Sequence, residues 1–330
     1  MRIVHLADLH LGYRAYNRVN ERGYNIREAD VFSAFTEALQ KIEQISPDLI
    51  ILAGDIFHKP RPSNHSILVT IRLLKQFRKN CQAPIVMIAG NHETVKLVDS
   101  GSILSIFEAT IPDVKVFDKD IRQYTIDSID TSLLCVPHGG LSSLNEICLK
   151  PDKSYKHNIM IIHGSYESCP QAIGYGDGAL IKETEINQPE WDYIAFGHYH
   201  RFTEIAKNAF YSGAIERTST NIWQEAEDKK GFIEYDFETR ICKFHSLSTP
   251  RRVVDIKRIN AENLTAEEIN NKITEEVSKI KDFEKSIVRV TVENIDPVAI
   301  RELDYRKIRE YKKHAVHFRL NLIRKDAVIA

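Results

Sequence analysis

The sequence has few cysteines, glycines and prolines. Its five cysteines, Cys81, Cys135, Cys148, Cys169 and Cys242, are odd in number and form no CxxC pair. We therefore expect reduced thiols, rather than a disulfide framework or a thiolate zinc site. With only 14 glycines and 11 prolines among 330 residues, the composition excludes collagen-like and linker-like chains.

Long hydrophobic runs are also missing. Apolar runs such as those at residues 49–53 and 159–162 are far shorter than the roughly 18 residues that a membrane span needs. The amino-terminal residues lack the parts of a signal peptide. We expect the protein to remain in the compartment where it is made, which is the cytoplasm beside the nucleoid if the source is prokaryotic, with no membrane contact.

A net charge of −1 conceals an uneven distribution of charge along the chain. Residues 1–250 carry 27 basic and 32 acidic side chains, whereas residues 251–330 carry 18 basic and 14 acidic ones. Within the second part, residues 301–325 hold nine basic and three acidic residues. This basic region suits an anionic partner such as nucleic acid, although a solvated helix face has the same composition.

Short apolar runs alternate with amphipathic segments in the first part of the chain. Strands are expected at 2–7, 49–53 and 85–89, and helices at 28–45 and 63–78. Later strands with shorter connections are expected at 132–136, 158–162, 193–196, 232–237 and 242–247, the last two as a hairpin. The early alternation is typical of βαβ units and a largely parallel sheet, and the later strands indicate a second sheet. The fold class is therefore α/β, a layered α/β/α sandwich of two packed sheets.

A domain boundary is expected near residues 248–252, where Pro250 interrupts the strand pattern. Beyond it, helices are expected at 266–280 and 297–311, and strands at 286–293 and 315–323. We expect a main domain of residues 1–250 and a small α+β domain of residues 251–330.

Metal-competent side chains follow almost every expected strand in the first 200 residues. In chain order, the clusters are Asp8-Leu9-His10, Gly54-Asp55, Gly90-Asn91-His92-Glu93, His163-Gly164 and Gly197-His198-Tyr199-His200. Because the carboxyl ends of strands in open α/β folds face the binding crevice, we expect the clusters to converge. Each cluster alone is common turn or cap chemistry, but five in this order indicate one site.

Seven of these side chains form a mixed set of oxygen and imidazole ligands: Asp8, His10, Asp55, Asn91, His163, His198 and His200. Such a set suits Mn²⁺, Fe or Zn²⁺ better than Mg²⁺. Seven ligands exceed the needs of one ion, so we expect two divalent ions bridged by one carboxylate. Pairs of this kind activate a water and stabilise an in-line displacement at phosphorus. The glycines beside the ligands are expected where a Cβ would crowd the site.

The ordered pattern DxH, GD, GNH[ED], H and GHxH is similar to that of the calcineurin-like metallophosphoesterases, over residues 5 to about 215. Within that superfamily, HLADLHLGY (5–13), GDIFHKPRPS (54–63) and GHYHRF (197–202) resemble the nucleases of double-strand-break repair, called SbcD in bacteria and Mre-eleven in archaea and eukaryotes. His58, three residues after Asp55, is a feature that generic phosphoesterases do not require. Residues 251–330 are similar in size and βα pattern to the DNA-capping domain of these nucleases.

The resemblance implies a role for each ligand. Asp8, His10, Asp55 and His200 would hold one ion, and Asp55, Asn91, His163 and His198 the other, with Mn²⁺ as the expected metal. His92 would lie beside the scissile phosphate, where it protonates the leaving oxygen or stabilises the pentavalent state. His58 would hold His92 or the phosphate in place. Glu93 stands where many relatives have Asp, a change expected to be neutral.

The resemblance also implies partners. These are DNA as double-stranded ends, hairpins and single strands, a second copy of the chain, and an ATPase of the SbcC or Rad-fifty type. The family continues into helices that bind this ATPase, and no such segment precedes Ala330, so the chain is either a truncated form or contacts the ATPase differently. Candidate DNA contacts are Tyr13, Arg14, Lys59, Arg61 and Arg201 near the metal loops, and Arg306, Lys307, Lys312 and Lys313 in the basic region. Tyr13 is equally suited to the core.

Three further features have both a functional and a structural interpretation. His138 in PHGG can approach the phosphate, although a loop histidine without ligand spacing is typical of the surface. The glycine-rich segment 165–178 lacks the lysine of a phosphate-binding loop and is expected to be a surface loop. The apolar stripe of an expected helix at 100–107 suits the core better than a dimer contact.

Three functions are compatible with these features. We favour a Mn²⁺-dependent DNA exonuclease or endonuclease, because of the ligand set, the two additional histidines and the basic carboxyl-terminal part. The alternative is a phosphodiesterase or phosphomonoesterase acting on a small nucleotide or other phosphate ester, for which the basic part is unnecessary. A non-catalytic DNA-binding scaffold is disfavoured because a decaying site loses ligands first, and none is missing.

Overall fold

The computed structural model describes residues 1–94, 101–146, 149–172 and 180–325, which form two compact units. Unit 1 consists of Met1–Ala15, Ile26–Thr218 and Asp228–Ser248. Unit 2 consists of Tyr16–Asn25, Ser219–Glu227 and the chain from Thr249 onward. The structure therefore groups two short segments of the amino-terminal part with the carboxyl-terminal part. The roles of the two domains expected from the sequence stay predictions.

Two six-stranded sheets form the centre of unit 1. The first, in the order β14-β13-β1-β2-β3-β4, contains β1 (Arg2–Leu6), β2 (Leu49–Ala53), β3 (Ile85–Ile88), β4 (Val114–Phe117), β13 (Gly231–Asp236) and β14 (Ile241–Ser246). The second, in the order β11-β12-β10-β7-β6-β5, contains β5 (Arg122–Ile126), β6 (Thr131–Val136), β7 (His157–His163), β10 (Tyr193–Gly197), β11 (Thr203–Ala206) and β12 (Ala209–Tyr211). Strands β8 (Ser165–Tyr166) and β9 (Leu180–Ile181) pair separately.

The strands that lead to the metal-competent clusters are parallel neighbours. In the first sheet, β1, β2 and β3 pair in parallel, and in the second sheet β6, β7 and β10 do the same. Strands β13 and β14 form the expected antiparallel hairpin. Parallel strands place their carboxyl ends at one edge, so each sheet brings its own clusters together.

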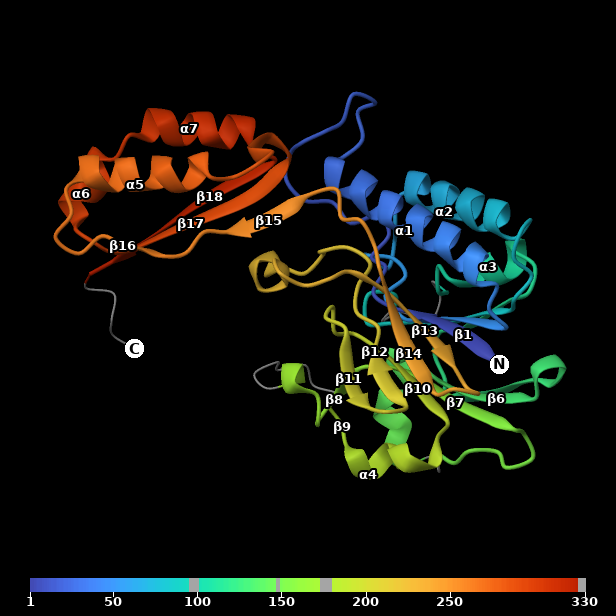
Figure 1. Ribbon diagram of the computed structural model, residues 1–330. Coiled ribbons are helices and arrows are strands. Elements are labelled where there is room, and N and C mark those ends of the chain that lie inside the picture. Colours follow the sequence, from blue (N-terminus) through green and yellow to red (C-terminus); the bar gives the residue numbers. More distant parts are fainter. Residues whose placement is uncertain (95–100, 147–148, 173–179, 326–330) are drawn as a thin grey trace. The chain divides into compact units, whose positions relative to one another are not determined.

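Helices cover the outer faces of the two sheets. The helices α1 (Ile26–Ile45), α2 (Asn64–Phe77) and α3 (Ser105–Thr110) lie on one side of the first sheet, and the second sheet lies on the other (Figure 1). Ile186 of the short helix α4 (Glu183–Ile186) lies in one buried cluster with Met160 and Ile194 of the second sheet. Short 3-10 segments occur at Asp127–Ile129, His138–Glu146, Pro170–Ala172, Gln188–Glu190, Ile222–Glu225 and Phe283–Lys285.

Side-chain alternation along β1 divides the core of unit 1. Val4 and Leu6 pack with the helices, whereas Ile3 packs with Leu133 and Ile159 of the second sheet. Successive strand residues point to opposite faces, so one buried strand supplies both cores. The layered α/β/α sandwich expected from the sequence is confirmed.

Most expected elements of unit 1 differ from the structure by one or two residues at an end, and two helices begin later than expected for a visible reason. Helix α2 begins after Ser63, whose hydroxyl accepts the backbone N–H of Ser66 as an N-cap. The helix expected at 100–107 begins only at Ser105, because residues 102–105 form a turn closed on the carbonyl of Ser102. Leu104 and Phe107 are buried in the core, as the structural interpretation expected. Residue 100 lies outside the described residues.

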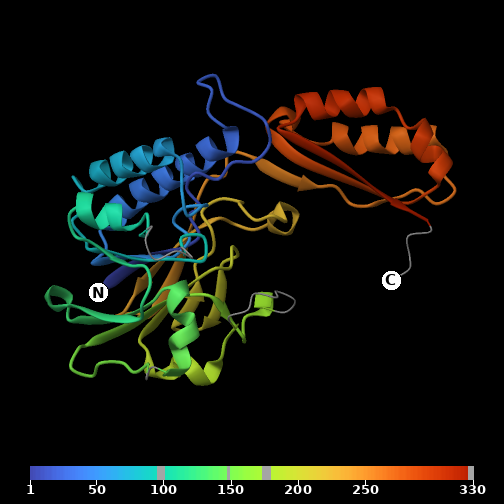
Figure 2. The ribbon, with the colours of Figure 1, turned by 180° about the vertical axis from the view of Figure 1, so that it is seen from behind.

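Unit 2 is a parallel sheet with helices on one face (Figure 2). Its strands are β15 (Arg252–Asp255), β16 (Ile259–Asn260), β17 (Ser286–Ile295) and β18 (His317–Arg324), and its helices are α5 (Ala266–Ser278), α6 (Pro297–Glu302) and α7 (Tyr305–His314). The single helix expected at 297–311 is wrong: it breaks at Leu303, and Asp304 starts α7 by accepting the backbone N–H of Lys307. Val288 and Val290 of β17 pack against Ile269 of α5 in this unit's own core.

Two other expectations, for the five cysteines and for the glycine-rich segment, concern sets of residues of which the structure describes only a part. The described cysteines Cys81, Cys135, Cys169 and Cys242 carry free thiols, and Cys148 lies outside the described residues. Residues 173–179 of the glycine-rich segment also lie outside them. In the described parts of the chain, no helix has the length and apolar character of a membrane span.

Candidate active site

The loops that follow β1 and β2 run side by side at the carboxyl edge of the first sheet. The backbone N–H of Asp8 donates to the carbonyl of Gly54 over 3.0 Å, and that of His10 donates to the carbonyl of Asp55 over 2.9 Å. Asp8, His10 and Asp55 have left-handed backbones, with φ values of 53°, 46° and 52°. Non-glycine residues in this region are strained, and such strain clusters at functional sites.

Close approach of the strand ends explains the neighbouring glycines. A Cβ on Gly197 would lie 1.8 Å from the carbonyl oxygen of Ala53, and one on Gly90 would lie 2.1 Å from Oδ1 of Asp55. Neither position has room for a side chain. The glycines therefore let the ends of β10, β3 and β2 meet, as expected from the sequence.

One group of predicted ligands gathers around His10. Its Nε2 lies 2.9 Å from Nε2 of His200 and 3.8 Å from Oδ2 of Asp55. One ligand atom from each of Asp8, His10 and His200 lies within 4.8 Å of the other two. The resemblance assigned these four residues to one ion, and the structure brings them together.

A second group gathers around Asn91. Its Oδ1 lies 3.1 Å from Nε2 of His163 and 3.2 Å from Nδ1 of His198. Nε2 of His163 also lies 3.6 Å from Oδ1 of Asp55, so Asp55 is common to both groups. The backbone N–H of His198 donates to both carboxylate oxygens of Asp8, each over 3.1 Å, and this contact joins the second group to the first.

Two histidines outside the ligand set lie at the same edge. Nε2 of His92 is 3.9 Å from Oδ2 of Asp55, and the backbone N–H of His92 donates to Oδ1 of that carboxylate over 2.9 Å. Nδ1 of His92 donates to the backbone carbonyl of His58 over 2.7 Å. The main-chain carbonyl of His58 therefore orients His92. The ring of His58 lies beside His10, with 3.4 Å between the two Nδ1 atoms.

Burial favours the uncharged form of His10, His58 and His163. Burial, followed by the nearby His92 and Lys59, lowers the pKa of His58 to about 4. Burial, followed by the repulsion of neighbouring histidines, holds the pKa of His10 and His163 well below the usual value. A neutral imidazole has a free nitrogen lone pair, which a metal ligand needs.

Glu93 connects the loops that follow β2 and β3. Its carboxylate accepts the backbone N–H of Phe57 over 2.6 Å and that of Gly90 over 2.9 Å. Burial raises the pKa of Glu93 to about 7, although these backbone contacts act in the opposite direction. Glu93 thus positions both loops through their backbone N–H groups.

The arrangement fits divalent cations. His163 donates from Nδ1 to the carbonyl of Ala53 over 2.8 Å, so its Nε2 lone pair faces Oδ1 of Asn91, which is also an acceptor. Burial, together with Glu93 and Asp8, raises the pKa of Asp55 well above its usual value. Facing lone pairs and buried carboxylates repel one another, and cations between them would remove that repulsion.

The remaining candidates near the metal loops have different surroundings. Tyr13 is buried in the core with its ring 4.9 Å from that of His58, and Arg14 is paired with Glu28 over 2.8 Å. Lys59 and Arg61 are exposed. Arg201 is paired with Asp228 over 2.9 Å.

His138 and the candidates of the basic region complete the placement. The ring of His138 lies 6.3 Å from that of His163, with its backbone N–H donated to the carbonyl of Ala89. The last four candidates lie on α7 in unit 2: Arg306, Lys307, Lys312 and Lys313. Arg306 and Lys307 occupy its first turn, and Lys312 and Lys313 its last.

Sequence reasoning missed a buried lysine behind the site. Lys230 is almost fully buried, and its Nζ donates to the backbone carbonyl of His200 over 2.8 Å. The sequence offers no signal for it, because Lys230 lies in a polar stretch that resembles a surface loop.

Comparisons with known proteins agree with the motifs. Residues 1–202 match the calcineurin-like phosphoesterase family. The chain is 27% identical to the DNA double-strand break repair protein Mre11 of Methanocaldococcus jannaschii, over 85% of this chain and 73% of the relative. It is 28% identical to the protein of the same name from Methanococcus maripaludis, over 82% and 74%.

One solved structure is more distant. The crystal structure of TT1561 from Thermus thermophilus aligns over 74% of this chain and 98% of that chain, with a TM-score of 0.40 and 9% identity, a likeness too low to support an argument. The family match itself covers more than half of the chain, including all five metal-competent clusters. The chain therefore belongs to the calcineurin-like phosphoesterase family and is a metal-dependent hydrolase of phosphate esters, as its motifs predict.

Proposed function

We propose that the protein is a Mn²⁺-dependent DNA nuclease of double-strand-break repair that cuts phosphodiester bonds at a dinuclear site. The observation that carries this proposal is the convergence of the seven predicted ligands with His92 and His58 at one edge. Mre11 relatives, named as DNA double-strand break repair proteins, support the choice of DNA. Mn²⁺ suits the mixture of carboxylate, amide and imidazole ligands.

Each ligand has a proposed position. Asp8, His10, Asp55 and His200 would hold one ion, and Asp55, Asn91, His163 and His198 the other. When bound, two such ions activate a water and offset the charge that develops on the phosphoryl oxygens.

The protein's own groups supply the proton. His92 is fixed by its Nδ1–H contact to the carbonyl of His58, so its Nε2 is the atom that faces the reaction centre. In its protonated form, His92 would donate from Nε2 to the leaving oxygen. The contact with the His58 carbonyl favours the protonated form of His92, although burial, the larger cause, lowers its pKa. Asp55 keeps the main chain of His92 in place through the N–H contact.

The small-ester alternative shares this site and differs in substrate. A basic carboxyl-terminal part is of use for DNA and not for a small nucleotide. An ATPase of the SbcC or Rad-fifty type, a second copy of the chain and a location beside the chromosome complete the proposal, because the resemblance of the motifs to the double-strand-break repair nucleases implies them.

Cleavage of labelled DNA by the purified chain tests this proposal. Linear double-stranded and hairpin DNA should be cut in Mn²⁺, and EDTA should abolish the cutting because the ligands then hold no ion. A small aryl phosphodiester, assayed in parallel, reports on the metal site without requiring DNA binding. Hydrolysis of that ester with intact DNA would favour the small-ester function, and no hydrolysis of either substrate would contradict both.

A further inference from the structure

The loop of residues 198–202 carries two predicted ligands that belong to different groups. His200 joins His10 in the first group, and His198 joins Asn91 in the second. The loop connects β10 with β11 and contains no helix or strand of its own. A loop backbone keeps conformational freedom unless contacts hold it, and the freedom that remains is lost when a metal binds. The contacts that hold the backbone at His198 and at His200 therefore influence the affinities of the two ions.

The backbone at His198 is held from the first sheet. Its N–H donates to both carboxylate oxygens of Asp8, each over 3.1 Å. Asp8 follows β1, which pairs with β13 on one side and with β2 on the other. His198 thus has an anchor of its own, which does not involve the main chain of His200.

The backbone at His200 is held from a different direction. Its carbonyl accepts the ammonium group of Lys230 over 2.8 Å and the backbone N–H of Ala214 over 3.1 Å. Lys230 directly precedes β13, and only 1% of its surface is exposed. The carbonyl of Lys230 accepts the backbone N–H of Leu247 over 2.7 Å. One end of this lysine is thus fixed beside the hairpin of β13 and β14, and the other end contacts a predicted ligand.

Neighbouring backbones leave His200 little room to shift. A Cβ on Gly213 would lie 3.0 Å from the carbonyl oxygen of His200 and 2.7 Å from the backbone nitrogen of Phe202. The carbonyl of Ala214 accepts the backbone N–H of Gly231 over 3.4 Å. The chain segments at His200, Ala214 and Gly231 therefore lie side by side, and the side chain of Lys230 reaches from the third segment to the first.

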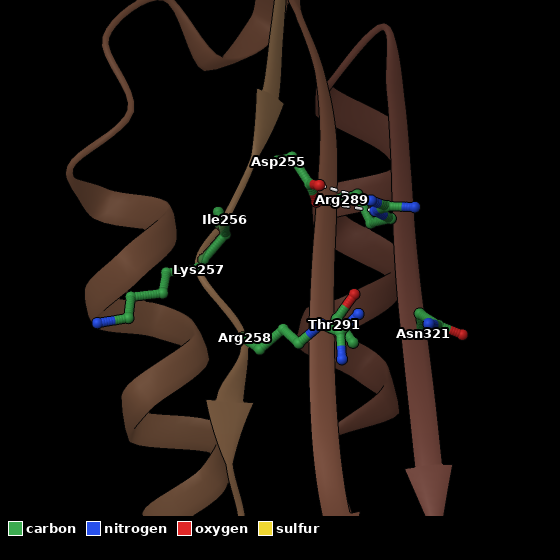
Figure 3. A pocket seen from close by; sticks show the side chains of 7 residues that line it. All are labelled: Asp255, Ile256, Lys257, Arg258, Arg289, Thr291 and Asn321. Carbon is green, nitrogen blue, oxygen red and sulfur yellow. Dashed lines mark hydrogen bonds and ion pairs between the residues drawn. The ribbon is translucent and has the colours of Figure 1, made fainter. Parts of the chain in front are cut away.

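Two other buried or partly buried cations are used differently. Nη1 of Arg27 lies 2.7 Å from a carboxylate oxygen of Asp30, three residues further along α1. In the pocket of unit 2 that Figure 3 shows, Nε of Arg289 donates to Asp255 of the neighbouring strand over 2.8 Å. Burying an ammonium group is unfavourable unless it is well hydrogen-bonded. Because the contact of Lys230 ends on the main chain of a predicted ligand, the structure links this buried charge to the metal site.

We propose that Lys230 is a positioning residue of the metal site, which holds the main chain of His200 so that its ring meets His10. The proposal rests on the dinuclear site proposed above. The ammonium group orders the loop before an ion arrives, so less freedom is lost on binding. Since His198 is held separately by Asp8, loss of Lys230 affects the ion at His200 and spares the other.

Calorimetric titration with Mn²⁺ tests this role. Lys230→Met keeps the length of the side chain and removes its charge. It should weaken one of the two Mn²⁺ affinities about 10-fold to 100-fold, the range for residues that orient metal ligands, and the other affinity should not fall. Electrostatics alone predicts the opposite sign, because removing a positive charge near two cation sites favours both ions. The sign of the change therefore separates positioning from a charge effect.

Three further variants complete the titration. Lys229→Met removes the same charge from the exposed neighbour and should leave both affinities unchanged. Lys230→Arg keeps a cationic donor and should retain most of the affinity that Lys230→Met loses. If Lys230→Met does not fold, Lys230→Gln, which is one bond too short for the contact, takes its place with the same expected loss. Unchanged or raised affinities, an equal loss of both, or an equal loss in Lys229→Met or Lys230→Arg would overturn the proposal.

Hydrogen exchange in EDTA supplies a measurement that needs neither metal nor activity. In Lys230→Met, the amides of residues 199–202 and of Ala214 should exchange faster, because the carbonyl of His200 has lost one of its donors. Unchanged exchange there, or faster exchange throughout unit 1, would contradict a local positioning role. If the unmodified protein binds one Mn²⁺ only, the dinuclear site is wrong, and the exchange rates still decide whether Lys230 holds His200.

Discussion

Replacing His92 with glutamine is expected to lower kcat/KM for DNA cleavage by about 10²-fold to 10⁴-fold, the contribution typical of a general acid or base. Glutamine keeps a polar group at this position but cannot transfer a proton. The Mn²⁺ content of the variant should equal that of the unmodified protein, because neither group of predicted ligands includes His92. Cleavage rates and elemental analysis of the same preparation measure both quantities.

His157→Gln is the matched control for this variant. His157 begins β7, whereas the predicted ligand His163 ends that strand. Cleavage by this control should be unchanged. Cleavage retained by the His92 variant would remove His92 from the mechanism. A loss of Mn²⁺ together with cleavage would make His92 a ligand, as the proximity of His10, His58 and His92 allows.

His58 gives the same experiment a second arm. The contact that orients His92 comes from the carbonyl of His58, which any residue at this position supplies. His58→Ala should therefore reduce cleavage less than the His92 variant does. An equal reduction would mean that the His58 ring itself acts on the substrate.

The strands that carry the site could be predicted because they are buried on both faces. Strand β2 consists of five buried apolar residues, and its expected bounds are those of the structure. The edge strand β5 was missed because it reads RQYTI, with no buried residue and no regular alternation. Pairing with β6, rather than local preference, determines it.

The convergence of the candidate ligands could be predicted for a related reason. A single sequence is enough to recognise a metal-competent residue at the end of an expected strand. Parallel pairing of the strands then brings these ends to one edge of the sheet. The supporting groups are not visible in this way. Glu93 and Lys230 act through backbone groups that lie far from them in sequence, such as Phe57 and His200. No local pattern specifies these partners.

The composition of unit 2 could not be predicted either. Residues 16–25 and 219–227 belong to it although each lies between segments of unit 1. The stacking of Tyr16 on His317 and the contact of Trp223 with Arg289, 4.9 Å from the ring centroid, link residues far apart along the chain. Contacts between residues so far apart form only when the chain folds. The periodicity of a sequence gives no information on them, because it reports on neighbouring residues only.

Asp55→Asn is expected to have the largest effect on the site, because Asp55 alone is common to both groups of predicted ligands. The variant should lose at least about 1,000-fold in kcat/KM, equivalent to about 4 kcal/mol, for DNA and for a small aryl phosphodiester alike. Calorimetry should show weaker binding of both Mn²⁺ ions. The contact with the backbone N–H of His92 should survive, since asparagine keeps an oxygen acceptor.

The same substitution should stabilise the protein once its metals are removed. Burial, Glu93 and Asp8 raise the pKa of Asp55, so its charged form is unfavourable in the folded state without a cation. In EDTA near neutral pH, the free energy of unfolding should be higher for the variant, because a carboxyl group whose pKa is raised on folding destabilises the folded state at pH values above its unfolded pKa. With Mn²⁺ added, only the unmodified protein should gain substantial stability, because a ligand that binds the folded state alone stabilises it. Denaturant unfolding of the variant and of the unmodified protein, each with and without Mn²⁺, measures these four free energies of unfolding. The prediction would be contradicted if, without metal, the variant were less stable than the unmodified protein. In that case the neighbours of Asp55 would stabilise its charged form, and bound ions would not act by relieving repulsion among the buried carboxylates.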